Sequence, residues 1–269
     1  HVRWMYRHFA ALKPARMWID DDVRMTLRAD MHCPCLCDVC RAEMARRTGR
    51  ACTGTELVQA ILADPPNPVR DAWLDFQDDL EVEIVRLLAE AIHAVSPETH
   101  VGLMHSNFEI HAAEGRRWHR LVEALGQPQP YFRPGIGPYV EVTGPGIAEA
   151  FNHTREMQPV LPPSVAIVPE IENYPHTRFM KSVATVRADM TLAQLMGLPG
   201  VTFSILRMNE RLDLELPREP AWQRLLGEVK PYLQQIADLH IEAAQHRGVG
   251  LFQHEDAARH RVQEELDGR

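Results

Sequence analysis

Positive charge is scarce relative to negative charge in this sequence. Its 269 residues include 29 Lys and Arg against 37 Asp and Glu, which gives a formal net charge of -8. Nucleic acid is bound through a basic face, and this composition offers none, which argues against nucleic acid as a partner. Long apolar runs are also missing, so a membrane span is not expected. With 45% hydrophobic residues the chain can still bury a sizeable core, and we expect a globular protein.

Cysteine is also sparse, and its number is odd. The chain has five cysteines. An odd set in a chain of this size does not fit a disulfide framework, and reduced thiols indicate a cytoplasmic protein.

Both ends of the chain look cut. The sequence opens with His1 rather than Met, and residues 4–12 already have a helical pattern that leads into a strand. At the other end, residues 248–252 have the pattern of an opening strand. We therefore expect a fragment in which residues 1–245 form part of a catalytic barrel and residues 246–269 are the start of a following domain or a tail.

Short apolar runs alternate with helical patterns along the chain. Five runs have the length and apolarity of strands buried on both faces, at residues 17–19, 101–104, 130–132, 165–168 and 201–206. Helices are predicted at 4–12, 37–47, 55–63, 69–95, 116–125, 146–157, 181–196 and 220–245. This alternation predicts a parallel sheet with right-handed crossovers.

Polar residues follow the apolar runs. They are Asp20 to Asp22, His105 to Asn107, Arg133, Glu170, Glu172 and Asn173, and Arg207, Asn209 and Glu210. The carboxyl ends of the strands carry the active site in a (β/α)8 TIM barrel. A doubly wound sheet usually has a Gly-rich phosphate loop, and none follows these runs. We therefore predict an α/β fold of the TIM barrel type.

Two carboxylate clusters end different strands. Asp20, Asp21 and Asp22 follow the first run, and Glu170 and Glu172 follow the fourth. Two carboxyl groups across a pocket are what glycoside hydrolysis requires, one as the proton donor and the other as the nucleophile or stabiliser. The plainer alternatives, an acidic turn for the first cluster and a polar strand edge for the second, stay open. Arg24, His105, Asn107, Arg133, Asn173 and Asn209 are candidate ligands of sugar hydroxyls, with helix capping or a place on the rim as the alternative.

Four cysteines lie within eight residues: Cys33, Cys35, Cys37 and Cys40. Thiolates this close can converge on a tetrahedral zinc ion, with Cys52 or a residue outside the chain to complete the set. Such a site would be structural and would fix the loop after the acidic strand end. Only Cys37 and Cys40 have a common zinc spacing, so an absence of metal also stays open. No cofactor is expected for catalysis.

Two segments resemble family 42 glycoside hydrolases, the β-galactosidases of the clan A barrels. Residues 18–22, followed by Cys35-x-Cys37-x-x-Cys40, resemble the strand of that family that ends in Asn-Glu and precedes a cysteine zinc loop. Residues 172–175 are similar to its Glu-x-x-Pro segment around the nucleophile. The resemblance implies that Asp22 stands at the acid/base, Asp21 at the preceding Asn, and Glu172 at the nucleophile. It also implies that the five runs are barrel strands four to eight and that the full-length protein forms a trimer.

Asp in place of Glu at the acid/base position shortens the reach of the proton donor by one methylene. The departure indicates a relative of family 42, for example a β-mannosidase-like branch. The predicted activity is a retaining hydrolysis of a β-galactoside or β-mannoside, in which adjacent carboxylates raise the pKa of Asp22. Two other functions stay open: a non-catalytic carbohydrate-binding or scaffold barrel, and a metal-dependent hydrolase that uses the Asp cluster with His105.

Overall fold

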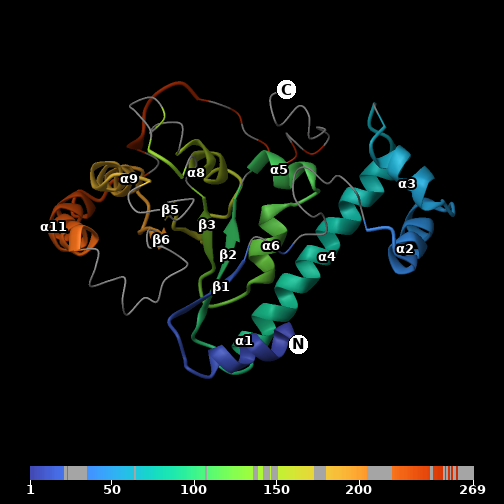
Figure 1. Ribbon diagram of the computed structural model, residues 1–269, viewed down its shortest axis with the longest axis horizontal. Helices are drawn as coiled ribbons and strands as arrows, with labels where there is room; N and C mark the ends of the chain where they lie inside the picture. Colours follow the sequence, from blue (N-terminus) through green and yellow to red (C-terminus); the bar gives the residue numbers. More distant parts are fainter. Residues whose placement is uncertain are drawn as a thin grey trace. The chain divides into compact units, whose positions relative to one another are not determined.

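The computed structural model describes residues 1–20, 23, 35–63, 65–106, 108–135, 139–141, 146, 151–172, 180–204, 220–242, 245–250, 252, 254, 256 and 259. The chain divides into two compact units. Unit 1 comprises residues 1–130, 160–162 and 253–269, and unit 2 comprises residues 131–159 and 163–252. Both units contain helices and strands, and the strand pairings described inside them are parallel (Figure 1). The predicted α/β class with parallel strands is therefore confirmed.

Unit 1 contains the first two predicted strands. Strand β1 (Arg16–Ile19) pairs in parallel with β2 (His100–His105), with Trp18 opposite Gly102. The indole of Trp18 lies directly over Gly102, where an added Cβ would come within 2.3 Å of the ring. A glycine is thus required in β2 for the large side chain of β1 to lie flat on the sheet.

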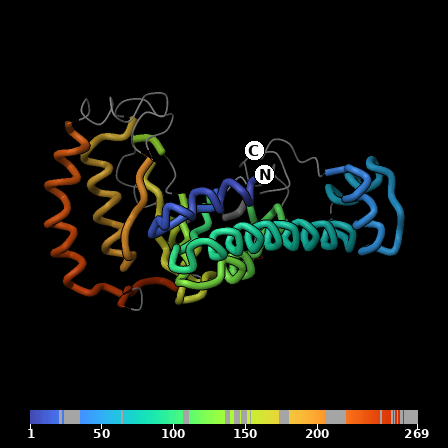
Figure 2. The backbone as a smooth tube through the Cα atoms, turned by 90° about the horizontal axis from the view of Figure 1, so that it is seen from below, coloured from blue at the N-terminus to red at the C-terminus, as the bar shows by residue number. Residues whose placement is uncertain are grey.

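The helices of unit 1 are arranged around one long helix. They are α1 (Val2–Ala10), α2 (Asp38–Thr48), α3 (Gly54–Ile61), α4 (Pro68–His93), α5 (Phe108–Ala113) and α6 (Trp118–Ala124). Asn67 caps α4, because its side-chain oxygen accepts from the amides of Val69 at 3.0 Å and Arg70 at 3.2 Å. Figure 2 shows α1 beside α4, and α2 and α3 at one end of α4. Helix α5 was not predicted from the sequence.

Unit 2 contains the other predicted strands. They are β3 (Tyr131–Pro134), β4 (Ala166–Ile167), β5 (Glu170–Glu172) and β6 (Thr202–Ser204). Strand β3 pairs with β4, and β5 pairs with β6. The run predicted at 165–168 contains β4. A further strand, β5, begins directly after Pro169, which has no amide hydrogen and separates the two strands. Glu170 and Glu172 therefore lie within a strand, not after it, and Arg133 lies within β3.

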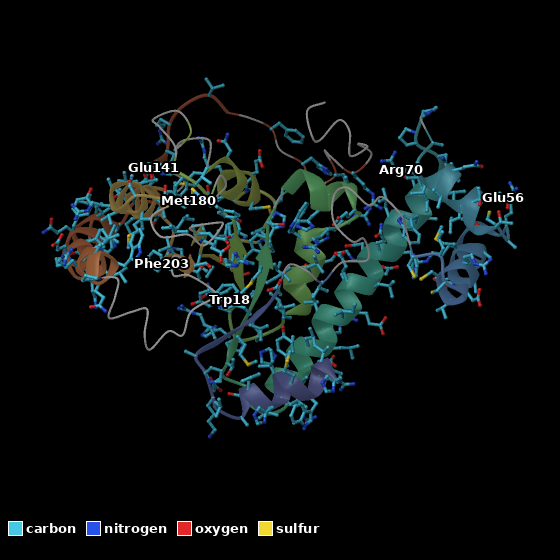
Figure 3. All side chains as sticks on the ribbon, in the orientation of Figure 1. Trp18, Glu56, Arg70, Glu141, Met180 and Phe203 are labelled. Carbon is cyan, nitrogen blue, oxygen red and sulfur yellow. The ribbon has the colours of Figure 1, made fainter. Side chains whose placement is uncertain are left out.

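Three helices in the described part of unit 2 accompany these strands: α8 (Asn152–Met157), α9 (Val183–Leu195) and α11 (Pro220–Ala237). The start of α9 is fixed by Glu141. Its carboxylate accepts from the amide of Ser182 at 2.6 Å and from the hydroxyl of Thr185 at 2.8 Å. The backbone supports this contact, because the amide of Glu141 donates to the carbonyl of Met180 at 3.0 Å, and the two residues lie side by side in Figure 3.

Two predicted elements differ from the structure. The helix predicted to end at residue 245 ends at Ala237. The strand predicted at 248–252 is wrong for the described residues of that segment, which have no strand conformation. Val249 and Phe252 are 90% and 91% exposed, so their side chains bury no surface that would hold a strand in place.

Candidate functional site

In unit 1, polar side chains lie where β1 and β2 end, as predicted. Asp20 directly follows β1 and is exposed. The amide of Val23 donates to the carbonyl of Asp20 at 3.4 Å, which closes a turn. Tyr6 lies nearby and donates its hydroxyl to the carbonyl of Trp18 at 3.2 Å. Burial raises the pKa of the Tyr6 hydroxyl, and the negative charge of Asp20 adds to the shift.

A buried ion pair supports this turn. Arg116 donates from Nε to Glu81 Oε2 at 2.9 Å and from Nη2 to the carbonyl of Val23 at 2.8 Å. Both charged side chains are 2% exposed. Burial raises the pKa of Glu81 to about 7, although the guanidinium of Arg116 opposes the shift. The buried side chain of Arg116 therefore holds the backbone at Val23 in place.

A second buried group lies at the end of β2. His105 is fully buried, and its Nδ1 accepts from Trp118 Nε1 at 3.2 Å. Its ring centroid lies 5.0 Å from that of His111. His111 Nε2 lies 2.9 Å from the Ser106 hydroxyl, and its Nδ1 lies 3.0 Å from Glu114 Oε2. His105 was predicted to bind a sugar hydroxyl, whereas the structure places it in the interior against two rings.

In unit 2, the predicted pair of glutamates occupies β5. Ile171 is fully buried, while Glu170 and Glu172 on either side are half-buried, which is the alternation that a strand produces. Glu170 accepts from Arg133 Nη1 of β3 in an ion pair. Arg133, predicted as a sugar ligand, thus forms an ion pair with a carboxylate on a strand of the other sheet. Glu172 lies opposite Ser204 of β6.

Several predicted site residues lie outside the described residues. They are Asp21, Asp22, Arg24, Cys33, Asn107, Asn173 and Asn209. Their assignments stay predictions.

Three of the predicted metal ligands are brought together. The Sγ atoms of Cys35, Cys37 and Cys40 all lie within 4.8 Å of one another, so this cluster could hold a metal ion. Cys40 is buried in a hydrophobic core that includes Met44 and Trp73, and Cys35 packs against that core. Cys52 packs against the same core, but it is not a member of the three-cysteine group.

The thiols of Cys37 and Cys40 differ in their electrostatic surroundings. Cys37 is the N-cap residue of α2, and the backbone amide of Cys40 lowers the pKa of its thiol to about 7. The Sγ atoms of Cys37 and Cys40 lie 3.5 Å apart, within hydrogen-bonding distance. Burial raises the pKa of the Cys40 thiol to about 12.

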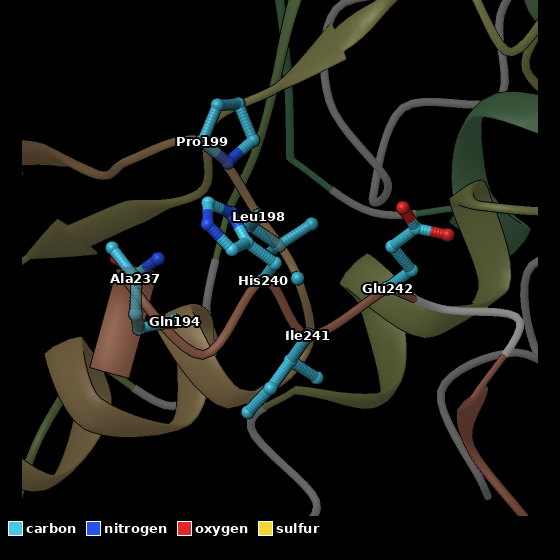
Figure 4. Close-up of a pocket in the computed structure, with 8 residues that line it drawn as sticks. Gln194, Leu198, Pro199, Ala237, His240, Ile241 and Glu242 are labelled. Atoms are coloured by element: carbon cyan, nitrogen blue, oxygen red, sulfur yellow. The ribbon is translucent and has the colours of Figure 1, made fainter. Parts of the chain in front are cut away.

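Two cavities in the described part of the chain lie away from these strand ends. In unit 2, a cavity of about 270 Å³ is lined by the end of α9, the segment before β6, and the residues that follow α11 (Figure 4). Leu198, Pro199 and His240 contribute to its wall. It therefore lies at the amino end of β6, the end opposite the one where active sites form in parallel α/β folds. In unit 1, a cavity of about 320 Å³ lies among Thr48, Cys52, Gln59 and their neighbours.

Sequence reasoning missed Glu81 and Arg116. A signal was available for Glu81, since it lies seven residues after Leu74 and four before Val85, on the buried stripe of α4. A carboxylate on such a stripe needs a buried partner. The residue that supplies it, Arg116, is 35 positions away, and the sequence does not indicate that pairing.

Each unit thus has polar side chains on its parallel strands or at their ends, in a chain of mixed α/β structure. Comparison with protein-family models, curated proteins and solved structures found no match. Among the described residues, no helix is both long enough and apolar enough to cross a membrane.

Proposed function

We propose that the chain is part of a retaining glycoside hydrolase of the (β/α)8 barrel type that acts on a β-galactoside or β-mannoside. The observation that carries the proposal is the position of Glu172 at the carboxyl end of β5, in a parallel pairing, on the same face as an ion-paired Glu170. Carboxylates at the carboxyl ends of barrel strands are the groups that perform this reaction.

The two glutamates receive different roles. The Arg133 guanidinium neutralises Glu170 and fixes its carboxylate, which makes Glu170 a positioning residue. Glu172, two residues further along the strand, is then the nucleophile that attacks the anomeric carbon. Asp22 protonates the leaving oxygen and afterwards activates water, with Asp20 and Asp21 beside it. Hydrolysis with retention requires the two reacting carboxyl groups to lie about 5 Å apart.

A structural zinc ion at Cys35, Cys37 and Cys40 belongs to the same proposal. The donor set fits, because zinc prefers thiolates and three sulfurs already lie within 4.8 Å of one another. The proposed fourth ligand is Cys33. The cysteines in the described part of the chain, at positions 35, 37, 40 and 52, form no disulfide, which supports the proposed cytoplasmic location.

The test compares variants of the complete protein on aryl β-galactosides and β-mannosides. Glu172→Gln and Asp22→Asn should each lower kcat/KM by at least about 10³-fold, because each removes a group needed in the transition state. Glu172→Gly should regain activity with azide and release a glycosyl azide of inverted configuration. Cys52→Ser, a change outside the strand ends, is the control and should retain activity. Unchanged hydrolysis by both Glu172→Gln and Asp22→Asn would show that the assignment is wrong.

A further inference from the structure

A serine, a histidine and a glutamate form a hydrogen-bonded chain after β2 that the glycosidase mechanism does not use. Ser106 Oγ lies 2.9 Å from His111 Nε2, and His111 Nδ1 lies 3.0 Å from Glu114 Oε2. His111 is fully buried, the Glu114 side chain is 11% exposed, and Ser106 is partly exposed. The first distance is typical of a nucleophile that is hydrogen-bonded to its general base, and the second of a base that is hydrogen-bonded to the group that orients it.

The chemistry of the three groups fixes the direction of the hydrogen bonds. An ionised carboxylate only accepts, so His111 carries its proton on Nδ1 and donates it to Glu114. The neutral ring then presents the lone pair of Nε2 to the hydroxyl of Ser106, which donates. This is the tautomer in which a histidine can remove a proton from a serine.

The backbone holds this chain in place. Helix α5 ends at Ala113, and Gly115, which follows closely, adopts a φ of +102°. The amide of Arg116 donates to the carbonyl of His111 at 3.0 Å. A Cβ on Gly115 would lie 2.5 Å from the carbonyl oxygen of Leu74 in α4. Only glycine therefore fits where the chain turns, and this turn places Glu114 beside the ring of His111.

We propose that Ser106, His111 and Glu114 form a second reactive site, a nucleophilic serine with acyl-transfer activity on small esters. The Ser106 oxygen attacks the ester carbonyl while His111 Nε2 takes its proton. The alcohol then leaves with that proton, and an acyl group remains on Ser106. Water, deprotonated by the same nitrogen, hydrolyses this ester to the acid and restores the serine. Glu114 is a positioning residue that holds the ring in the reactive tautomer.

The test labels the intact chain with a fluorophosphonate probe and maps the adduct by mass spectrometry. In this reaction the Ser106 oxygen bonds to phosphorus, fluoride leaves, and the proton passes to His111. We expect a single adduct on Ser106, which is lost in Ser106→Ala. His111→Gln should slow labelling by at least about 10²-fold, and Glu114→Gln by a similar factor with an altered pH profile, since the wrong tautomer is then available.

Ser182 supplies an internal control, because its hydroxyl also contacts a carboxylate, that of Glu141 at 2.8 Å, but no histidine contact is described for it. It should remain unlabelled. Circular dichroism establishes that each variant is folded, and Ser106→Thr gives a second, conservative change should His111→Gln not fold. An unlabelled Ser106 in the folded protein would overturn the proposal. Equal labelling of Ser106 and Ser182 would also overturn it, because the histidine would then make no difference. The outcome is independent of the glycosidase assignment, since no residue of that mechanism is changed.

Discussion

Arg116 Nη2 donates a 2.8 Å hydrogen bond to the main-chain carbonyl of Val23, while its Nε pairs with Glu81 of α4. One buried guanidinium thus connects the long helix of unit 1 with the chain that follows the acidic strand end. In the proposed glycosidase this is the segment that carries the acid/base, so a residue that contacts no substrate can still control where a proton donor stands.

The first prediction concerns Arg116. At a pH above about 7, where Glu81 is ionised, Arg116→Ala should lower the free energy of unfolding by about 3–5 kcal/mol, because it leaves a carboxylate buried without its partner. Amide exchange in a peptide that covers residues 17–23 should also become faster. The control is Arg187→Ala, which breaks an exposed pair with Glu228 at 3.3 Å and should cost less than about 1 kcal/mol. Similar losses in urea melts of the two variants would contradict a special role for Arg116.

The second prediction concerns pH. Glu81 has a pKa of about 7 in the folded protein, against 4.5 for an ordinary Glu, so the folded state keeps a proton that the unfolded chain releases. The folded state therefore binds more protons between these values, and the contribution of Glu81 to stability falls as pH rises from 4.5 to about 7. Glu81→Gln should remove about 3 kcal/mol of that decline. Urea melts at several pH values check this, and parallel curves for the two proteins would refute it.

The third prediction concerns the ion pair in unit 2 between Lys181 and Asp189. Both side chains are 1% exposed, and Nζ lies 2.9 Å from Oδ2. Lys181→Met alone should cost about 3–5 kcal/mol, because burial without a partner penalises the remaining charge. The double variant Lys181→Met with Asp189→Leu should recover most of this loss. A double-mutant cycle by chemical denaturation measures the coupling, and simple additivity would show that the pair is not linked.

The fourth prediction concerns zinc. Protein purified without chelators should contain about one zinc ion per chain, held by the thiol cluster. Cys37→Ser and Cys40→Ser should each lose the metal, whereas Cys52→Ser should retain it, because Cys52 is not in the cluster although it packs against the same core. Elemental analysis gives the metal content, and a chelator should lower the melting temperature only of proteins that contain zinc. Equal zinc content in all four proteins would place the metal elsewhere.

Local patterns in the sequence predicted much of the fold. The runs at 17–19 and 101–104 lie in β1 and β2, and the helix predicted at 69–95 is α4, because apolar periodicity and capping residues act over a few neighbouring positions. Helix α5 was missed, since it is only 6 residues long and too short to show a periodic pattern.

The candidate site was likewise predicted from the sequence only in part. The spacing of Cys35, Cys37 and Cys40 indicated that these thiols can converge, and their sulfur atoms do lie close together, because a turn into a helix brings positions two and three apart together. The positions of Glu170 and Glu172 on one face likewise follow from strand alternation. The role of Glu170 does not, since Arg133 lies 37 residues away on another strand.

The sequence by itself determined the strand and helix segments, the parallel class and the cysteine cluster, because each depends on residues close together in the chain. Only the tertiary structure decided which charges are buried and which partners they find. Glu81 forms an ion pair with Arg116, which lies 35 positions away in the sequence. Ser106 contacts His111 because helix α5, which was not predicted, brings the two side chains together. Burial depends on the packing of segments distant in sequence, and it is burial that makes an ordinary carboxylate hold its proton to a pH near 7.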